Sequence, residues 1–388
     1  MSSESLRQRQ GLLLLLTLSF GYVIYAVDRS ILSSVLSVME TELNLTKPEV
    51  GLLGSAQYLG VLGVVFLSGY FSDRFGRKKI ILAGVIMFTT FTWTIAIAQN
   101  FFWAFLFRFL SGIGEGLFWP VAMAAVAETF SGRKGVSLGI FYVGFDVGSV
   151  AGLAAGAFVY TIFESWRYTF LLTPLAGIPV IIGILLSRNN LETGNKMISG
   201  ARIVIKKNEI QAVMLFAFLA TWASVWQVVF LPYYFYKVMH FGVLPSALLS
   251  SLVLLSGAVG KVVMGRVSDT IGREKVLLIS SLLVVSSFLI FFFVSNFEVS
   301  FAGALMMGFF GSSVFPVMQA LAAEYAKGAP GTSLGMTTSS QSVATVLAPA
   351  ISGYLFYLGV GRALALDAII PSALMVCVAS FLLIRRIG

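Results

Sequence analysis

Charged residues are scarce in this 388-residue sequence. Asp, Glu, Lys and Arg together make up 11% of it, whereas hydrophobic residues make up 58% and the mean hydropathy is +0.92. A water-soluble domain carries about 25% charged residues, because its surface must be hydrated. The composition therefore excludes an ordinary soluble protein, and we expect most of the chain to lie in lipid.

Cysteine and histidine are almost absent. The single cysteine, Cys377, excludes an intramolecular disulfide and a cysteine metal site, and the single histidine is His240. The sequence also contains no phosphate-binding loop, dinucleotide fingerprint or nucleophile elbow in a suitable context. We therefore expect no cofactor, no metal site and no enzymatic activity.

Apolar runs separated by short polar segments occupy most of the chain. Each run is about 20 residues long, which is the length that a helix needs to cross the hydrocarbon core of a bilayer. The pattern predicts an all-α membrane protein with twelve transmembrane helices. The twelve runs lie near residues 11–35, 49–71, 79–99, 101–128, 135–162, 168–187, 210–236, 244–265, 276–296, 299–325, 333–359 and 364–384.

The net charge of +9 is distributed unevenly along the chain. Most Lys and Arg residues fall in every second polar segment, beginning with the N-terminal one, and basic residues mark the cytoplasmic side of membrane proteins. We therefore expect both termini to be cytoplasmic, in a multi-pass protein of the cell membrane. The basic excess is explained by topology, and we expect no nucleic-acid partner.

The sequence repeats itself at an offset of 196 residues. This offset predicts two parallel six-helix halves, residues 1–187 and 210–388, joined by a cytoplasmic linker at 188–209. Six residues of the segment between the second and third runs recur at this offset, and so do residues of the fourth run. Gly69, Ser72, Asp73, Gly76, Arg77 and Lys79 align with Gly265, Ser268, Asp269, Gly272, Arg273 and Lys275, and Pro120 and Glu128 align with Pro316 and Glu324.

The repeated segments GYFSDRFGRKK (69–79) and GRVSDTIGREK (265–275) carry a family resemblance. They resemble the signature loops of the major facilitator superfamily, which implies two pseudo-symmetric six-helix bundles, secondary transport by alternating access, and a monomer. In physical terms, glycine permits close helix approach, and the arginines can pair with acids such as Glu128. The predicted gating residues are Gly69, Asp73, Arg74, Gly76, Arg77, Glu128, Gly265, Asp269, Gly272, Arg273 and Glu324.

Five ionisable residues fall inside apolar runs of the first half. A charge at hydrocarbon depth is unfavourable unless it is paired or hydrated, so each one is a functional candidate. Asp28 and Arg29 are adjacent in the first run, Arg108 and Glu115 lie seven residues apart on one helix face, and Asp146 falls in the fifth run. Their partners at the 196-residue offset are uncharged. We therefore predict that the acid and base chemistry is confined to the first half.

The Asp-Arg pair of the first run, together with RFLSGIGEGLFWP (108–120), resembles the anion:cation symporter branch of the superfamily. The resemblance implies that Asp28 and Glu115 bind protons, that Arg29 anchors a substrate carboxylate and that Arg108 is an ion-pair partner. The spinster group of lysolipid transporters has a similar arrangement, so an exporter of drugs or lysolipids remains the alternative. The non-functional interpretation is a buried structural ion pair between Asp28 and Arg108.

Further residues are candidates for contacts with substrate. Asp146 can be protonated, pair with Arg29 or Arg108, or indicate a zwitterionic or cationic substrate, and Lys261 can line the cavity or extend to the cytoplasm. Uncharged side chains with polar tips at hydrocarbon depth must find partners within the protein or its ligand. The candidates for substrate binding are Arg29, Arg108, Asp146, Tyr22, Tyr25, Gln57, Tyr58, Trp222, Trp226 and Gln341.

Glycines at four-residue spacing, Gly144, Gly148, Gly152 and Gly156, form a stripe on the fifth run. Such a stripe predicts close packing against a neighbouring helix.

Taken together, these patterns predict a transporter that works by alternating access. We expect it to move a small organic solute through a membrane, namely an organic anion in symport with protons.

Overall fold

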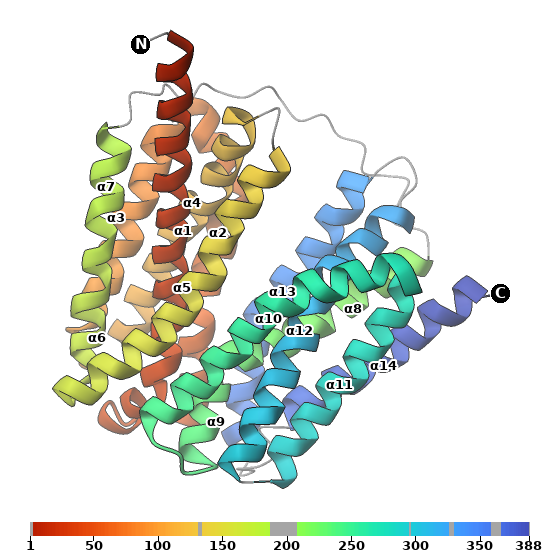
Figure 1. The fold of residues 1–388 in the computed structure, drawn as a ribbon. Coiled ribbons are helices and arrows are strands. Elements are labelled where there is room, and N and C mark those ends of the chain that lie inside the picture. The colour runs from red at the N-terminus through yellow and green to blue at the C-terminus, as the bar shows by residue number, and fades with distance from the viewer. Residues whose placement is uncertain are drawn as a thin grey trace. The chain divides into compact units, whose positions relative to one another are not determined.

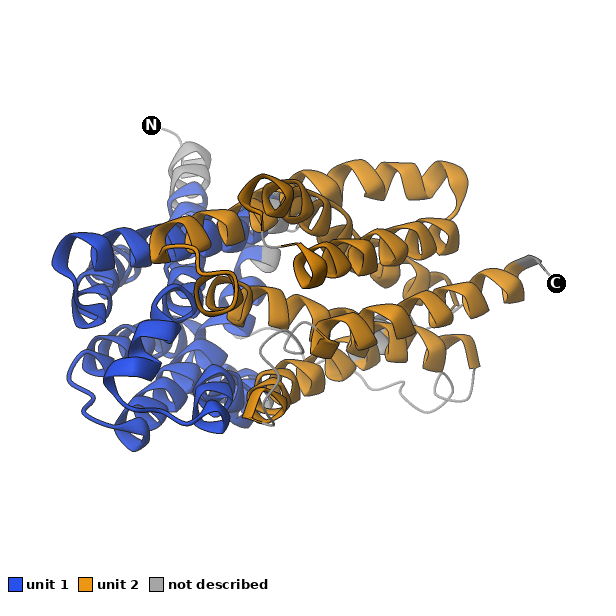
Figure 2. Cartoon of the chain, turned by 90° about the horizontal axis from the view of Figure 1, so that it is seen from below, with its two compact units in different colours: residues 1–196 blue, residues 197–388 orange. Residues whose placement is uncertain are grey.

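The computed structural model describes residues 3–130, 134–186, 208–294, 296–325, 330–357 and 366–387. These residues form α-helices, one short 3₁₀ helix and connecting turns, and the described part of the chain contains no strand (Figure 1). The chain divides into two compact units, residues 1–196 and 197–388, which Figure 2 shows in different colours. The predicted all-α architecture is confirmed.

The first unit begins with four long helices. They are α1 (Ser3–Glu42), α2 (Lys47–Phe75), α3 (Arg77–Ile95) and α4 (Phe101–Thr129). α5 (Lys134–Phe163) follows, and the unit's last described stretch is made of α6 (Trp166–Leu172), a 3₁₀ turn (Thr173–Ala176) and α7 (Gly177–Leu186). The turn contains Pro174, whose missing N–H interrupts the α-helical hydrogen bonding there.

The second unit has the same order of long helices. It contains α8 (Asn208–Val229), α9 (Leu231–Lys237), α10 (Val243–Ile271), α11 (Arg273–Phe293), α12 (Phe297–Tyr325), α13 (Pro330–Tyr357) and α14 (Leu366–Ile387). α8 and α9 together occupy one predicted run, and Pro232 sits where the helix is interrupted.

The described residues of each predicted apolar run lie mainly in helices. Among the described residues, ten stretches are long and apolar enough to cross a membrane, and α6 and α7 count together as one of them. α2 and α13, which are 29 and 28 residues long, are not among the ten. The predicted linker lies outside the described residues up to position 207. Its last two residues, Asn208 and Glu209, instead begin α8.

The glycine stripe on α5 faces α1. A Cβ atom built on Gly148 would lie 2.2 Å from the carbonyl oxygen of Val23, and one on Gly144 would lie 2.7 Å from that of Ser19. Such separations are closer than side chains tolerate, so only glycine allows the two backbones to touch. The predicted close approach is confirmed, and it fixes how α1 is placed against α5.

Repeat-related glycines make the same contact in both units. A Cβ atom on Gly112 of α4 would lie 2.1 Å from the carbonyl oxygen of Gln57 on α2. At the equivalent place in the second unit, a Cβ atom on Gly308 of α12 would lie 1.9 Å from the carbonyl oxygen of Val253 on α10. The internal repeat therefore extends to the backbone contacts between helices.

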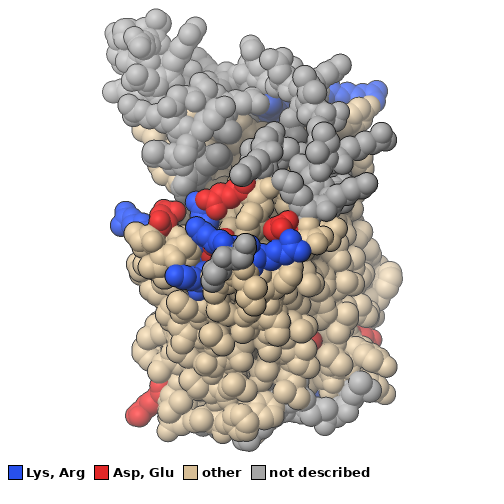
Figure 3. All heavy atoms as spheres, turned by 90° about the vertical axis from the view of Figure 1, so that its right-hand side faces the viewer, with Lys and Arg blue, Asp and Glu red and all other residues tan. Residues whose placement is uncertain are grey.

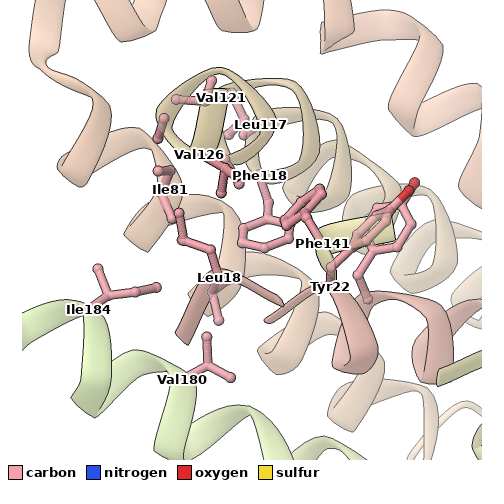
Figure 4. Packing of buried hydrophobic residues seen from close by; sticks show 14 of the residues in the cluster. Leu18, Tyr22, Ile81, Leu117, Phe118, Val121, Val126, Phe141, Val180 and Ile184 are labelled. Atoms are coloured by element: carbon pink, nitrogen blue, oxygen red, sulfur yellow. The ribbon is translucent and has the colours of Figure 1, made fainter. Parts of the chain in front are cut away.

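The apolar core of the first unit joins α1, α3, α4, α5 and α7. Leu18, Ile81, Phe118, Phe141 and Val180 come from these five helices and are buried against one another (Figure 4). Aromatic and branched side chains packed at this density resist volume changes, so the core holds α1 and α4 at a fixed separation. These two helices carry four of the five ionisable candidates.

Gly148→Ala is expected to destabilise the protein by roughly 1–3 kcal/mol, because the added methyl group forces α5 away from Val23. Gly63→Ala on α2 is the matched control, since a Cβ atom there has no neighbour within 4 Å among the described residues. Thermal unfolding of the detergent-purified protein, followed by tryptophan fluorescence, measures the difference. Equal unfolding midpoints for the two variants would contradict the packing role of the stripe.

Candidate functional site

Three helices of the first unit bring their polar side chains together at one place. α1 contributes Asp28 and Arg29, α2 contributes Gln57, and α4 contributes Arg108 and Glu115. Asp28 and Arg108 are each 3% exposed, Gln57 is 2% exposed and Glu115 is fully buried. The residues that the sequence singled out separately therefore form one buried network.

Asp28 is the most extensively hydrogen-bonded member. Its Oδ1 accepts from Thr92 Oγ1 at 2.5 Å, and its Oδ2 accepts from Ser111 Oγ at 2.6 Å. Gln57 Nε2 also donates to Oδ2 at 3.0 Å, and Arg108 Nη1 lies 3.6 Å from Oδ1. Three donors and a nearby guanidinium compensate the loss of water, so the site accommodates an ionised carboxylate at this position.

Arg108 acts mainly on the backbone of α1. Its Nη1 donates to the carbonyl oxygen of Asp28 at 2.9 Å, and its Nη2 donates to that of Arg29 at 3.0 Å. Its Nε has no hydrogen-bond partner among the described residues. Arg108 therefore ties α4 to α1 just where α1 presents its two charged side chains.

Arg29 has a different environment. Its Nε donates to Glu115 Oε2 at 2.9 Å, and its guanidinium carbon lies 4.9 Å from the ring centre of Tyr25 and 4.6 Å from that of Tyr58. Neither Nη1 nor Nη2 donates to any side chain or carbonyl in the described part of the chain. The Arg29 side chain is 15% exposed, whereas that of Glu115 is 0% exposed. Arg29 thus presents two unused donors at an accessible edge of the network.

Gln57 connects the two carboxylates. Its Nε2 donates to Asp28 Oδ2 at 3.0 Å and to Glu115 Oε1 at 2.7 Å. An amide nitrogen carries two hydrogens, so one group can serve both acids at once. This position differs from the direct substrate contact that the sequence suggested, because the amide nitrogen is already engaged between two buried acids.

Thr92 on α3 and Ser111 on α4 were not among the sequence candidates. Their hydroxyl groups lie 3.1 Å apart, and both bond to Asp28. A signal for Ser111 existed, since it lies three residues after Arg108 and four before Glu115 and therefore shares their helix face. Thr92 had no such signal, because its role depends on how α3 packs against α1.

The aromatic candidates of α1 are packed among other rings. Tyr22 stacks on Phe141 with ring centres 4.4 Å apart, and the Tyr22 and Tyr25 ring centres are 5.1 Å apart. Phe145 of α5 lies 5.6 Å from Tyr22. Asp146, the next residue on α5, is half-buried and interacts electrostatically with Tyr22. An aromatic cluster therefore lies directly beside Arg29.

The candidates of the second unit have other surroundings. Trp226 is fully buried, with its ring edge-on to Phe288 at 5.4 Å, so it is a packing residue. Trp222 is 8% exposed, while Gln341 and Lys261 are half-buried.

Buried acids are also found outside the first unit. In the second unit Glu274 is 2% exposed and Asp367 is 6% exposed. Both lie in the first turn of their helices, α11 and α14; Glu274 precedes the predicted run at 276–296, whereas Asp367 falls inside the predicted run at 364–384.

The signature loops contain a glycine in a left-handed conformation. Gly76 has φ 89° and Gly272 has φ 99°, and each connects two long helices of its unit. Only glycine adopts such angles without strain, which explains its place in both loops. Gly69 and Gly265 differ from expectation, because a Cβ atom on either would have no neighbour within 4 Å among the described residues. They do not mediate close helix approach in this structure.

In the second unit the signature loop forms ion pairs. Arg273 pairs with Glu324 of α12 and lies 3.6 Å from Asp269 of α10. Figure 3 shows that acidic and basic side chains gather in one zone of the face drawn, above a largely uncharged surface. In the first unit Arg77 is buried and Arg74 lies over the ring of Phe75. The side chains of Asp73 and Glu128 lie outside the described residues.

Asp28→Asn is expected to destabilise the protein by roughly 3–5 kcal/mol, because it leaves Arg108 buried without its carboxylate. The double variant Asp28→Asn/Arg108→Gln should lose less than the sum of the two single variants. Glu42→Gln is the control, since the exposed Glu42–Arg167 pair should contribute about 1 kcal/mol or less. Thermal unfolding of the four variants measures these values, and strict additivity would show that the two residues do not interact.

The sequence matches the family profile described as the Major Facilitator Superfamily over residues 18–260 and again over 213–387. Its relatives include Protein spinster of Drosophila melanogaster, 26% identical over 198 residues, which are 51% of this chain and 33% of spinster. The chain thus spans about a third of the length of that relative. They also include the uncharacterized MFS-type transporter YceJ of Bacillus subtilis (strain 168), 22% identical over 352 residues, with 86% of each chain covered.

A solved structure shares the fold. It is a bacterial homologue of the human lysosomal transporter spinster in an inward-facing, unoccupied conformation, with a TM-score of 0.76, 17% identity, and 97% of this chain and 95% of that chain covered. The predicted resemblance to spinster proteins is therefore confirmed. Because the family profile covers nearly the whole chain, this protein belongs to the Major Facilitator Superfamily and is a multi-pass secondary transporter rather than an enzyme.

Proposed function

We propose that this transporter moves a small organic anion together with protons, with Arg29 as the anion anchor and Glu115 as a proton-binding residue. The observation that carries the proposal is the state of Arg29. Its guanidinium uses only Nε to bind Glu115, while Nη1 and Nη2 have no partner among the described residues. Two parallel N–H groups on one edge of a guanidinium match the two oxygens of a carboxylate.

Anion binding and proton binding are coupled because Glu115 shares its Arg29 counterion with the substrate. When an anion binds Arg29, the cation is shared between two negative groups, and Glu115 is too deeply buried to be stabilised by water. A buried carboxylate that loses its counterion binds a proton instead. Anion binding therefore favours protonation of Glu115, and protonation frees Arg29 for the anion.

Asp28 would be the second member of the proton-binding pair. Gln57 donates to both acids, so a change of charge on Glu115 alters the donor that Asp28 shares with it. Asp28 keeps its contacts with Thr92, Ser111 and Arg108 whether Glu115 is ionised or protonated. These contacts favour a supporting role in which Asp28 also maintains the geometry of the network.

The remaining assignments extend this proposal. Tyr25 and Tyr58 orient Arg29, and Tyr22 extends the aromatic cluster. Asp146, Trp222 and Gln341 are candidates for further substrate contacts, whereas Trp226 is buried as a packing residue. The signature loops would gate the transport cycle. The protein is proposed to be a monomer of the cell membrane with both termini in the cytoplasm, as the distribution of basic residues suggests.

The alternative function is export of amphipathic molecules. The ring of Tyr25, which lies beside Arg29 and against Tyr22, favours it, because an aromatic surface next to a guanidinium suits an anionic head group with an apolar chain. Relatives include a protein named sphingosine-1-phosphate transporter in Xenopus tropicalis, 29% identical over 172 residues. Another, in Acinetobacter baylyi, is named niacin transporter and is 30% identical over 195 residues. The two names represent the two substrate classes.

Glu115→Gln is expected to abolish accumulation driven by a proton gradient while leaving substrate counterflow intact, because glutamine cannot take up the proton. Proteoliposomes loaded with nicotinate, ascorbate or a lysophospholipid provide the assay, and the probe that wild-type protein transports is used for the variants. Glu42→Gln serves as the control, because Glu42 is an exposed acid in the same unit. Gradient-driven accumulation that survives in Glu115→Gln would remove Glu115 from the coupling.

Arg29→Lys is expected to weaken anion binding by about 10- to 100-fold, since an ammonium group lacks the paired Nη donors and the flat face that lies between two tyrosines. Arg167→Lys, at the exposed pair with Glu42, is the matched control. Saturation of nicotinate or lysophospholipid counterflow gives the apparent affinity. An unchanged affinity in Arg29→Lys would show that the anion binds elsewhere.

A further inference from the structure

The second unit contains a buried acid whose surroundings differ from those of Asp28. Asp367, in the first turn of α14, is 6% exposed. The hydroxyl group of Ser352 on α13, which is itself fully buried, donates to Asp367 Oδ2. No Lys, Arg or His among the described residues lies within 4.0 Å of this carboxyl group. Asp28, at similar burial, has three hydrogen-bond donors and a guanidinium.

Trp222 of α8 is the other polar group at this position. Its indole Nε1 is buried and makes no hydrogen bond of normal geometry, yet the ring lies close enough to Asp367 to interact with the carboxyl group. Trp222 therefore offers Asp367 a poorly aligned, uncharged donor in addition to Ser352. Its presence beside an acid without a counterion indicates a site that is not built around a fixed charge.

The charged groups of the helices packed around α14 lie at its other end. α14 contacts α8 and α11, and Ser352 links it to α13. Arg385 of α14 pairs with Glu209 of α8, and Arg386 pairs with Glu274 of α11. Residues 367 and 385 are separated by about 27 Å along a helix. The titratable residues described on α13 are Tyr354 and Tyr357, which are both exposed. No described charge therefore neutralises Asp367.

We infer that Asp367 is a second proton-binding site, located in the second unit, whose carboxyl group is protonated when it is packed against Ser352. An ionised carboxylate at this burial needs a cation or several donors, and the start of a helix compensates only a small part of that cost. A metal cation would require more oxygen ligands than the single hydroxyl of Ser352 supplies. A neutral carboxylic acid needs neither, and its carbonyl oxygen still accepts from Ser352.

This inference is independent of the proposed Arg29–Glu115 mechanism, since the two sites share no residue and lie in different units. In this site Trp222 lies beside Asp367, whereas the sequence predicted a direct contact between Trp222 and the substrate. Separation of α13 from α14 would expose the Asp367 carboxyl group to water and release its proton. The protonation of Asp367 would therefore depend on the contact between these two helices.

Infrared spectroscopy of the protein in lipid nanodiscs at about pH 5, where an ordinary aspartate is ionised, tests the site directly. The carbonyl band of a protonated carboxylic acid should be present in the wild type, and Asp367→Asn should lose one component of it entirely. Glu115→Gln should leave that component unchanged, which distinguishes the two sites. Asparagine is nearly isosteric and uncharged, so Asp367→Asn should fold, and its unfolding midpoint is measured alongside.

Ser352→Ala provides the second test. It keeps the acid and removes the hydroxyl donor, so the component assigned to Asp367 should persist at a shifted frequency. Spectra of the wild type and Asp367→Asn that coincide in this region would show an ionised Asp367 and overturn the inference. Loss of the component when sodium chloride replaces choline chloride would also overturn it, because the site would then bind a metal cation.

Discussion

The ion pair between Arg29 and Glu115 is the interaction on which the proposed chemistry depends. A fully buried carboxylate inside a membrane protein is stable only with a counterion or a proton, and here the counterion is partly accessible and lies over the rings of Tyr25 and Tyr58. The same arginine therefore stabilises the acid and offers donors to an anion. The substrate anion and the Glu115 carboxylate compete for this single positive charge. This competition is sufficient to link the binding of the anion to the binding of a proton.

The surrounding structure holds this pair at the required distance. Arg108 binds the backbone carbonyls of residues 28 and 29, and the glycine stripe of α5 brings the α1 backbone into direct contact on another side. Asp28 is enclosed by donors from α2, α3 and α4. These contacts immobilise α1, so that Arg29 is the accessible charged member of the network. Rigid support of this kind preserves the geometry while one proton is exchanged.

Much of this arrangement could be predicted from the sequence. The lengths of the apolar runs gave the helices, because the bilayer sets the length of a span, and the offset of 196 residues revealed the two halves. Asp28, Arg29, Arg108 and Glu115 could be chosen because charge in an apolar run is conspicuous. Thr92 could not, because a hydroxyl group in a helix is common and its role depends on tertiary packing. Asp367 lies inside the twelfth apolar run and is open to the same selection by charge, whereas the neighbours of Gly69 depend on tertiary packing that the sequence does not show.

Proton uptake on binding is the most direct test of the account. Purified protein in weakly buffered solution with a pH-sensitive dye is mixed with nicotinate or with a lysophospholipid, whichever probe the wild type transports. Protons are expected to leave the solution as the anion binds, in proportion to the occupied sites, when Glu115 is initially ionised. Saturable binding with no proton uptake at any pH would contradict the idea that the anion and the Glu115 carboxylate compete for the charge of Arg29.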